Sequence, residues 1–282
     1  MTASARATFG NVPLELLTLP AFPSVSAKAL RLLSNSDTRL LELHEALSAD
    51  PSFSSEILRI ANSPLYPVVS QVKSLTQASM LLGFERLKGI VVSLGVRSYL
   101  TDLLQVPVLR ACWRHSLACA LIAEEATANQ ASGYDAYTAG ILHDIGRIAF
   151  AAILPGPYAN LLENVEDSAA TLEQERDSFG IDHCEAGRRL VSAWRLPQEL
   201  EVVTSQHHHD LRERNEFDLL SIVHYSCRIA DILGFHASRR ANVPRYEELL
   251  QEIPLSARRM FTFDPSALAR TVTAHIDALD TA

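Results

Sequence analysis

The chain has 282 residues, of which 48% are hydrophobic and 21% are charged, and its formal net charge is −8. This composition is typical of a globular protein with one or two domains and excludes a disordered chain. Because an acidic protein repels phosphate backbones and anionic headgroups, neither nucleic acid nor a membrane surface is expected as a partner.

No apolar run reaches the ~18 residues that a membrane-spanning helix needs, and the first residues lack the apolar stretch of a signal peptide. The cysteines form no Cys-x-x-Cys pair, so reduced thiols in a cytoplasmic protein are expected. Cys112, His115 and Cys119 could share one helical face as half of a zinc site, although buried cysteines more often fill apolar space.

Helix signals begin after a loose tail at residues 1–10. Asp50-Pro51 places a capping carboxylate before a proline, which predicts a helix that Asn62-Ser63-Pro64 ends. A second helix is predicted to begin at Ser74 and to end at Gly83, since glycine favours the conformation that closes a helix.

The second half of the chain continues the helical pattern. Asp182 and Glu185 have capping-box spacing, a helix with a buried stripe is predicted over 217–234, and Asp264-Pro265 begins the last helix. Strict alternation of apolar and polar residues is nearly absent. The sequence therefore predicts an all-α fold of about a dozen helices.

Three segments are expected along the chain. Residues 11–107 form an N-terminal helical subdomain, residues 108–235 form a subdomain with nearly all the chemically interesting side chains, and residues 236–282 form a C-terminal helical extension.

The segment Gly140 to Arg147 indicates the chemistry most clearly, because His143 and Asp144 stand side by side in an apolar stretch. With histidines and an aspartate up- and downstream, it could build a metal site in the folded chain. Nitrogen and oxygen donors of this kind suit Fe, Mn, Zn or Ni rather than Ca. The candidate ligands are His115, His143, Asp144, His183, His207, His208 and Asp231.

Each candidate also has a structural interpretation when it is considered alone. A buried Asp231 needs a partner, which could be a metal, Arg228 or a backbone N–H. His115 and His183 are ambiguous alone, and the run from His207 to Asp210 could be a solvated loop. The remaining histidines are interpreted as structural: His44, His224, His236 and His275.

The order of His115, His143-Asp144 and Asp231 resembles the H…HD…D signature of the HD phosphohydrolase superfamily. Further motifs resemble an HDOD domain over roughly residues 13–235. These motifs are Leu19 to Pro23, Asp50 to Ser63, Ala78 to Gly83, Trp113 to Ser116, Trp194 to Pro197 and Ile229 to Asp231.

The resemblance implies an all-helical bacterial protein linked to signalling and regulation. His115, His143, Asp144 and Asp231 match the four superfamily metal positions. His183 and the pair His207-His208 match extra histidines of the related HD-GYP phosphodiesterases, which implies one or two ions.

The sequence departs from the HD-GYP pattern at two points. Arg147 stands where those proteins usually carry lysine, and the Gly-Tyr-Pro motif is missing, since Pro155 to Tyr158 has similar letters in another order. Hydrolysis of cyclic dinucleotides is therefore not expected.

Two functions follow. The first is a regulatory or scaffolding module whose HD pocket binds a metal, a nucleotide-like ligand or nothing, and which signals to a protein partner through its surface. The second is a metal-dependent phosphohydrolase, either a phosphomonoesterase or a phosphodiesterase, acting on a phosphate- or nucleotide-containing small molecule. In the second, Asp144 helps to hold the metal and Arg147 stabilises the developing charge.

Overall fold

The structure is a computed structural model that describes residues 40–66, 71–98, 100, 104–128, 133–165, 168–211, 214, 216–238 and 243–280. The predicted tail and the Leu19 to Pro23 motif lie outside these residues. Within them the chain forms helices and no strand, so the predicted all-α class is confirmed.

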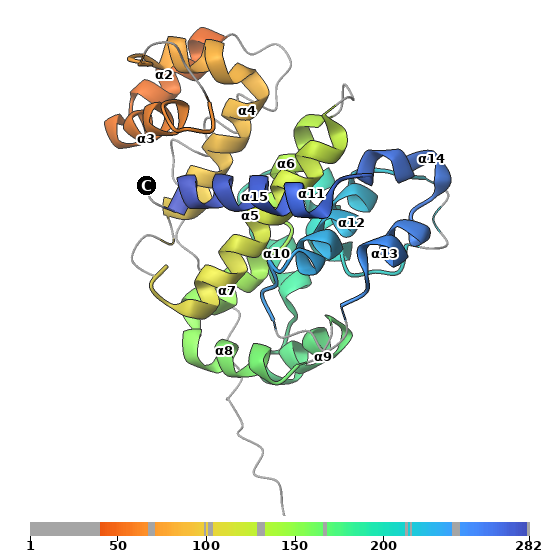
Figure 1. Cartoon of the computed structure of the whole chain (residues 1–282). Coiled ribbons are helices and arrows are strands. Elements are labelled where there is room, and N and C mark those ends of the chain that lie inside the picture. Colours follow the sequence, from red (N-terminus) through yellow and green to blue (C-terminus); the bar gives the residue numbers. More distant parts are fainter. Residues whose placement is uncertain are drawn as a thin grey trace, which may run out of the picture.

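The described helices are labelled in chain order (Figure 1). They are α2 (Leu40–Ser48), α3 (Pro51–Ala61), α4 (Leu75–Ser98), α5 (Pro107–Thr127), α6 (Gly133–Leu142), α7 (Ile145–Ile153), α8 (Pro155–Glu163), α9 (Ser168–Phe179), α10 (His183–Ala193), α11 (Gln198–Gln206), α12 (Leu219–Ile232), α13 (Tyr246–Glu252), α14 (Leu255–Arg258), the 3-10 helix η2 (Arg259–Phe261) and α15 (Pro265–Asp280).

Two predicted helix boundaries show how local sequence sets the N-terminal part. The Asp50 carboxylate accepts the backbone N–H groups of Ser52 and Phe53 at 3.0 and 3.1 Å, which caps α3 as expected. Gly83 has φ 75° and ψ 163°, so the helix geometry breaks there as predicted. The chain becomes helical again directly after this break, and α4 continues to Ser98.

Helix α5 forms the centre of the core. It packs against α6, α7, α12 and α15 (Figure 1). Trp113 and Leu117 on one face of α5 and Ile122 on the opposite face are fully buried. A helix that is buried on opposite faces lies inside the protein, so α5 carries His115 into the interior.

The C-terminal helix α15 contacts both the central helix α5 and the N-terminal helix α3. Arg114 on α5 forms an ion pair with Asp277 at 3.3 Å, and the guanidinium of Arg59 on α3 donates to the carbonyl of Ala278 at 2.9 Å. Asp264 caps α15 by accepting the N–H of Ala267 at 2.8 Å, as the sequence predicts.

Two glycines bring the helices around His143 and Asp144 into very close contact. A Cβ atom on Gly140 would lie 2.5 Å from Cα of Ala120 on α5, and one on Gly146 would lie 2.0 Å from the carbonyl oxygen of His183 on α10. Only glycine permits these approaches, because the obstructing atoms are backbone. The two glycines therefore hold the turn between α6 and α7 against α5 and α10.

None of the helices in the described ranges is both long and apolar enough to cross a membrane. The expected cytoplasmic location and the division of the chain at residues 107 and 235 stay predictions.

Candidate metal centre

His143 and Asp144 lie in the turn between α6 and α7, where both side chains are buried. The backbone of Asp144 has φ −103° and ψ 21°, a sparsely populated conformation that often occurs at functional sites. Its carbonyl oxygen accepts the N–H groups of Arg147 and Ile148 at 2.9 and 3.3 Å, which begins α7.

The Asp144 carboxylate stands at the centre of four imidazoles from four segments of the chain. Its Oδ1 lies 3.1 Å from Nε2 of His207 and 3.4 Å from Nε2 of His183. Its Oδ2 lies 3.6 Å from Nε2 of His143 and 3.7 Å from Nε2 of His115. These predicted ligands thus meet at one point, although up to 92 positions of sequence separate them (207 − 115).

The other ring nitrogen of each histidine fixes its tautomer. Nδ1–H donates to the carbonyl of Phe235 from His115 at 2.6 Å and to that of Gly140 from His143 at 2.7 Å. The Nδ1–H of His183 donates to the carboxylate of Glu175 at 2.6 Å. The Nδ1–H of His207 reaches two carbonyls of its own helix, both at 3.2 Å. Since all these partners are acceptors, each Nδ1 carries the proton and each Nε2 presents a lone pair.

In this arrangement the lone pairs of the Nε2 atoms and of the Asp144 oxygens repel one another, and a cation between them would remove the repulsion. Bare Nε2 atoms face the oxygens of Asp144, and one extra proton could relieve only one such contact. Nε2 of His143 is buried and has no hydrogen-bond partner among the described residues. Buried polar atoms are rarely left unsatisfied, and histidine ligands of metals typically have Nδ1 held in this way. The residues therefore fit a divalent metal ion.

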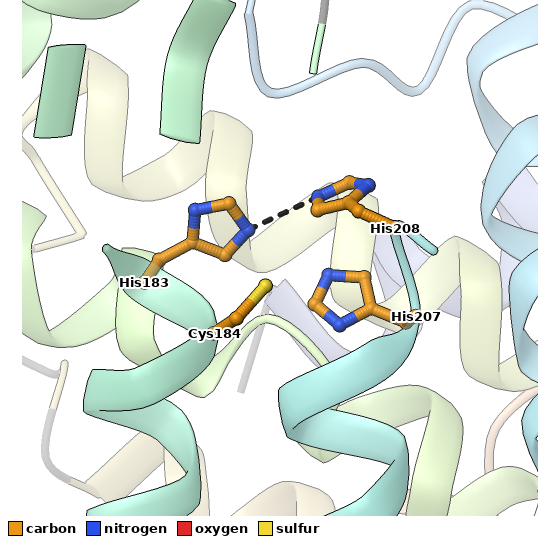
Figure 2. Close-up of side chains that lie close together, drawn as sticks. All are labelled: His183, Cys184, His207 and His208. Carbon is orange, nitrogen blue, oxygen red and sulfur yellow. Dashed lines mark hydrogen bonds between the residues drawn. The ribbon is translucent and has the colours of Figure 1, made fainter. Parts of the chain in front are cut away.

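His208 lies beside His183 and His207 and extends the cluster (Figure 2). Its Nε2 lies 3.0 Å from Nε2 of His183, and the ligand atoms of His183, Cys184, His207 and His208 all lie within 4.8 Å of one another. Nε2 of His208 also lies 3.3 Å from Nη2 of Arg147. The first contact requires this nitrogen to donate and the second requires it to accept, so one neutral ring cannot satisfy both.

Arg147 is a buried cation beside this cluster. Its Nε donates to Oδ1 of Asp144 at 3.1 Å, while its Nη1 is buried with no hydrogen-bond partner among the described residues. Burial by itself would raise the pKa of the Asp144 carboxyl, but the guanidinium of Arg147 is the largest of the influences that hold that pKa well below its ordinary value. Asp144 is thus ionised, as a metal ligand must be.

Burial also keeps three of these histidines neutral. It lowers the pKa of His143 to about 3, although the Asp144 carboxylate acts in the opposite direction. Burial lowers the pKa values of His183 and His208 as well. Neutral imidazoles are the form that binds metal ions.

On the α12 side of the cluster, Cys227 as well as the predicted ligand Asp231 lies close to His115. Oδ1 of Asp231 lies 3.6 Å from Nδ1 of His115, the nitrogen that faces away from Asp144. Arg228, the alternative partner considered for Asp231, forms a two-point ion pair with Glu252 at 2.5 and 2.9 Å. One turn before Asp231, Sγ of Cys227 lies 3.4 Å from Nε2 of His115.

The other histidines lie outside the cluster. His209 and His236 are exposed, and Nδ1–H of His275 donates within its own helix to Thr271. His224 supports the cluster indirectly, because its Nδ1–H donates at 2.8 Å to the carbonyl of His207. The side chain of His44 is outside the described residues.

Sequence reasoning missed Glu175 on α9. This carboxylate is fully buried, and its Oε2 accepts both the backbone N–H of His183 at 2.8 Å and the ring Nδ1–H of the same residue. Burial opposes its ionisation, but His183 and Arg147 hold the pKa of Glu175 below its ordinary value. Its helix is polar, with no apolar stripe to single it out, so no sequence signal indicated this role.

A cavity of about 670 Å³ adjoins the cluster. Its lining includes His207, His208, Cys227, Arg228 and Asp231. A pocket of this size suits a small molecule and gives it access to the edge of the histidine cluster.

The helical bundle and its central Asp144 surrounded by histidines define an HD-type protein whose cluster could bind a metal. Residues 19–210 match the HDOD domain family. The chain therefore belongs to the HDOD family, which confirms the predicted resemblance.

Solved structures share the fold. An HDOD domain protein of unknown function from Geobacter sulfurreducens has a TM-score of 0.67 at 20% identity, over 93% of this chain and 91% of that one. A candidate phosphohydrolase from Shewanella amazonensis SB2B has a TM-score of 0.66 at 22% identity, over 96% and 99%. A candidate signal transduction protein from Marinobacter aquaeolei VT8 has a TM-score of 0.70 at 18% identity, over 94% and 60%.

A curated relative, an uncharacterized protein of Treponema pallidum (strain Nichols), is 25% identical over 196 residues. The match covers 68% of this chain but only 38% of the Treponema protein.

Proposed function

We propose that this chain is a bacterial regulatory HDOD protein that works through a metal centre built around Asp144. The observation that carries the proposal is the ring of imidazoles whose Nε2 lone pairs face this one ionised carboxylate. The site comprises the seven residues that the sequence predicts, namely His115, His143, Asp144, His183, His207, His208 and Asp231.

The donor set supports one or two divalent transition-metal ions, with Fe, Mn, Zn and Ni as the candidates. When bound, such an ion would act as a Lewis acid toward a phosphate oxygen. The chain's own residues provide the rest of the site. The Nδ1 contacts orient the imidazoles, and burial keeps His143 neutral. A signalling protein is the proposed partner, a suggestion that the name of the Marinobacter structure supports.

Elemental analysis of protein purified without chelator or nickel resin tests this proposal. We expect one or two transition-metal ions per chain, loss of metal in Asp144→Ala, and unchanged metal content in His275→Ala. The His275 ring is a suitable control, because it bonds only within its own helix in the described contacts. Absence of metal even after incubation with Fe, Mn or Zn would overturn the proposal.

A second candidate function is metal-dependent hydrolysis of a phosphate ester. The cavity of about 670 Å³ beside the cluster and the buried Nη1 of Arg147 favour it. Asp144 would hold the metal, and Arg147 would stabilise charge that develops on the phosphate. Hydrolysis of phosphomonoesters or phosphodiesters that rises with added Mn would support this function, whereas a flat response across metals and substrates would favour regulation alone.

A further inference from the structure

We propose that Cys227 supplies a thiolate ligand to this metal centre. This inference rests on the proposed metal function, since a thiolate ligand requires a bound metal. It assigns a sulfur to a site that the sequence presents as purely nitrogen and oxygen.

The position of the Cys227 sulfur is the first observation in favour of a thiolate ligand. Sγ of Cys227 lies 3.4 Å from Nε2 of His115, and the ligand atoms of His115, His143 and Cys227 all lie within 4.8 Å of one another. In a tetrahedral zinc site with Zn–N near 2.0 Å and Zn–S near 2.3 Å, a nitrogen and a sulfur ligand are about 3.5 Å apart. The observed separation therefore suits two ligands of one ion.

An independent observation comes from His143. Its Nε2 is buried, lacks a hydrogen-bond partner among the described residues, and belongs to the same group of ligand atoms. The alternative explanation of Cys227 is a weak S–H donor to His115. That hydrogen bond would leave the lone pair of His143 unsatisfied, whereas an ion between the three side chains satisfies all of them.

Asp231 occupies a different position on the same helix. Its carboxylate lies 3.6 Å from Nδ1 of His115, on the proton-bearing side of the ring, beside the bond from this nitrogen to Phe235. The 3.6 Å separation is longer than a hydrogen bond, and this nitrogen already donates its proton to the carbonyl of Phe235. Cys227, one turn earlier, is on the side of the free Nε2.

The sulfur changes the expected metal. Thiolates favour zinc, whereas manganese prefers carboxylate and water ligands.

Cobalt substitution tests the ligand directly. The full-length protein, freed of metal and loaded with one equivalent of Co²⁺, should show a near-ultraviolet thiolate-to-cobalt charge-transfer band. Cys227→Ser should lose this band while still binding cobalt. Cys119→Ser, a buried thiol on α5, Cys184→Ser on α10 and Asp231→Asn should all keep it.

The outcomes separate this inference from the proposed function. Cobalt bound to the wild type without the band, or a band that survives in Cys227→Ser or is lost in Cys184→Ser, would overturn the role of Cys227 and leave the metal centre intact. Failure of the wild type to bind any metal would overturn both.

Should Cys227→Ser fail to fold, X-ray absorption on the zinc form provides a second measurement. A sulfur at about 2.3 Å from zinc that persists in Cys112→Ser, Cys119→Ser and Cys184→Ser assigns the ligand to Cys227. A shell of nitrogen and oxygen alone in the wild type would contradict the inference.

Discussion

The Nδ1–H of His183 donates to the carboxylate of Glu175 at 2.6 Å, and neither side chain is exposed to solvent. The other oxygen of Glu175 accepts the hydroxyl of Tyr158 at 2.8 Å. Tyr158 is thus linked through Glu175 to the histidine cluster. It belongs to the segment Pro155 to Tyr158, which contains the residues of a Gly-Tyr-Pro motif in a different order. The cluster depends on α8 and α9 as well as on the helices that carry its histidines.

Glu175→Gln should weaken metal binding. The amide keeps the shape of the side chain but removes the charge that orients His183 and strengthens it as a ligand. Loss of such a supporting group typically reduces metal affinity about 10- to 100-fold, which equilibrium dialysis with Zn²⁺ would measure. Glu173→Gln on the exposed side of α9 is the matched control and should bind zinc as the wild type does. Equal affinities for Glu175→Gln and the control would show that Glu175 is only a packing residue.

Gly146→Ala should destabilise the fold and disturb the cluster together. The added methyl group would meet the His183 carbonyl at 2.0 Å, and this atom cannot move without shifting α10. Overpacking of this kind costs about 1–3 kcal/mol in the free energy of unfolding, measurable by urea denaturation, and zinc affinity should fall as His183 is displaced. At Gly156 on α8 a Cβ would meet nothing within 4 Å, so Gly156→Ala should not lower stability and should leave zinc affinity unchanged. Wild-type stability in Gly146→Ala would mean that the contact between α7 and α10 relaxes freely.

The same contacts explain how much of the molecule could be predicted from its sequence. Helix class and boundaries follow from local signals, since Asp50, Asp182 and Asp264 each cap the helix that the sequence predicts. The capping box at Asp182 is only half formed, because the side chain of Glu185 pairs with Arg188 and Arg189 instead.

The candidate site was predictable in its histidines and Asp144, because the adjacent pair His143-Asp144 has a recognisable context. Glu175 and Cys227 were not predictable, because their roles depend on which helix faces lie together. That packing is determined by close backbone contacts such as the one at Gly146, and no local pattern encodes the partner of such a contact.

The metal-free protein should lose stability as the pH falls from about 7 to about 5. An unfolded histidine takes up a proton below a pKa of about 6.5, whereas burial keeps the pKa of folded His143 at about 3. The unfolded state therefore binds more protons in this window, and each such histidine lowers the free energy of unfolding by roughly 2 kcal/mol at pH 5. Protonation of Asp144 acts in the same direction but only below its unfolded pKa, near 4.

Urea denaturation at several pH values would measure how steeply the free energy of unfolding depends on pH, and His143→Gln should make this dependence shallower by about one proton. A stability that does not change over this window would contradict the buried, neutral state of His143.

Arg147→Gln should move stability and metal affinity in opposite directions. In the metal-free protein Arg147 neutralises the buried Asp144 carboxylate, and removal of one partner from a buried ion pair typically costs about 3–5 kcal/mol. A bound metal also needs Asp144, so the guanidinium competes with it for the same oxygen, Oδ1. Without Arg147 we expect a lower melting temperature for the metal-free form, a tighter zinc dissociation constant, and a larger rise in melting temperature when zinc is added. Arg147→Lys retains the charge and should stay near the wild type in zinc affinity. If Arg147→Gln instead binds zinc more weakly than Arg147→Lys, then Arg147 supports the ligand geometry and does not compete with the ion.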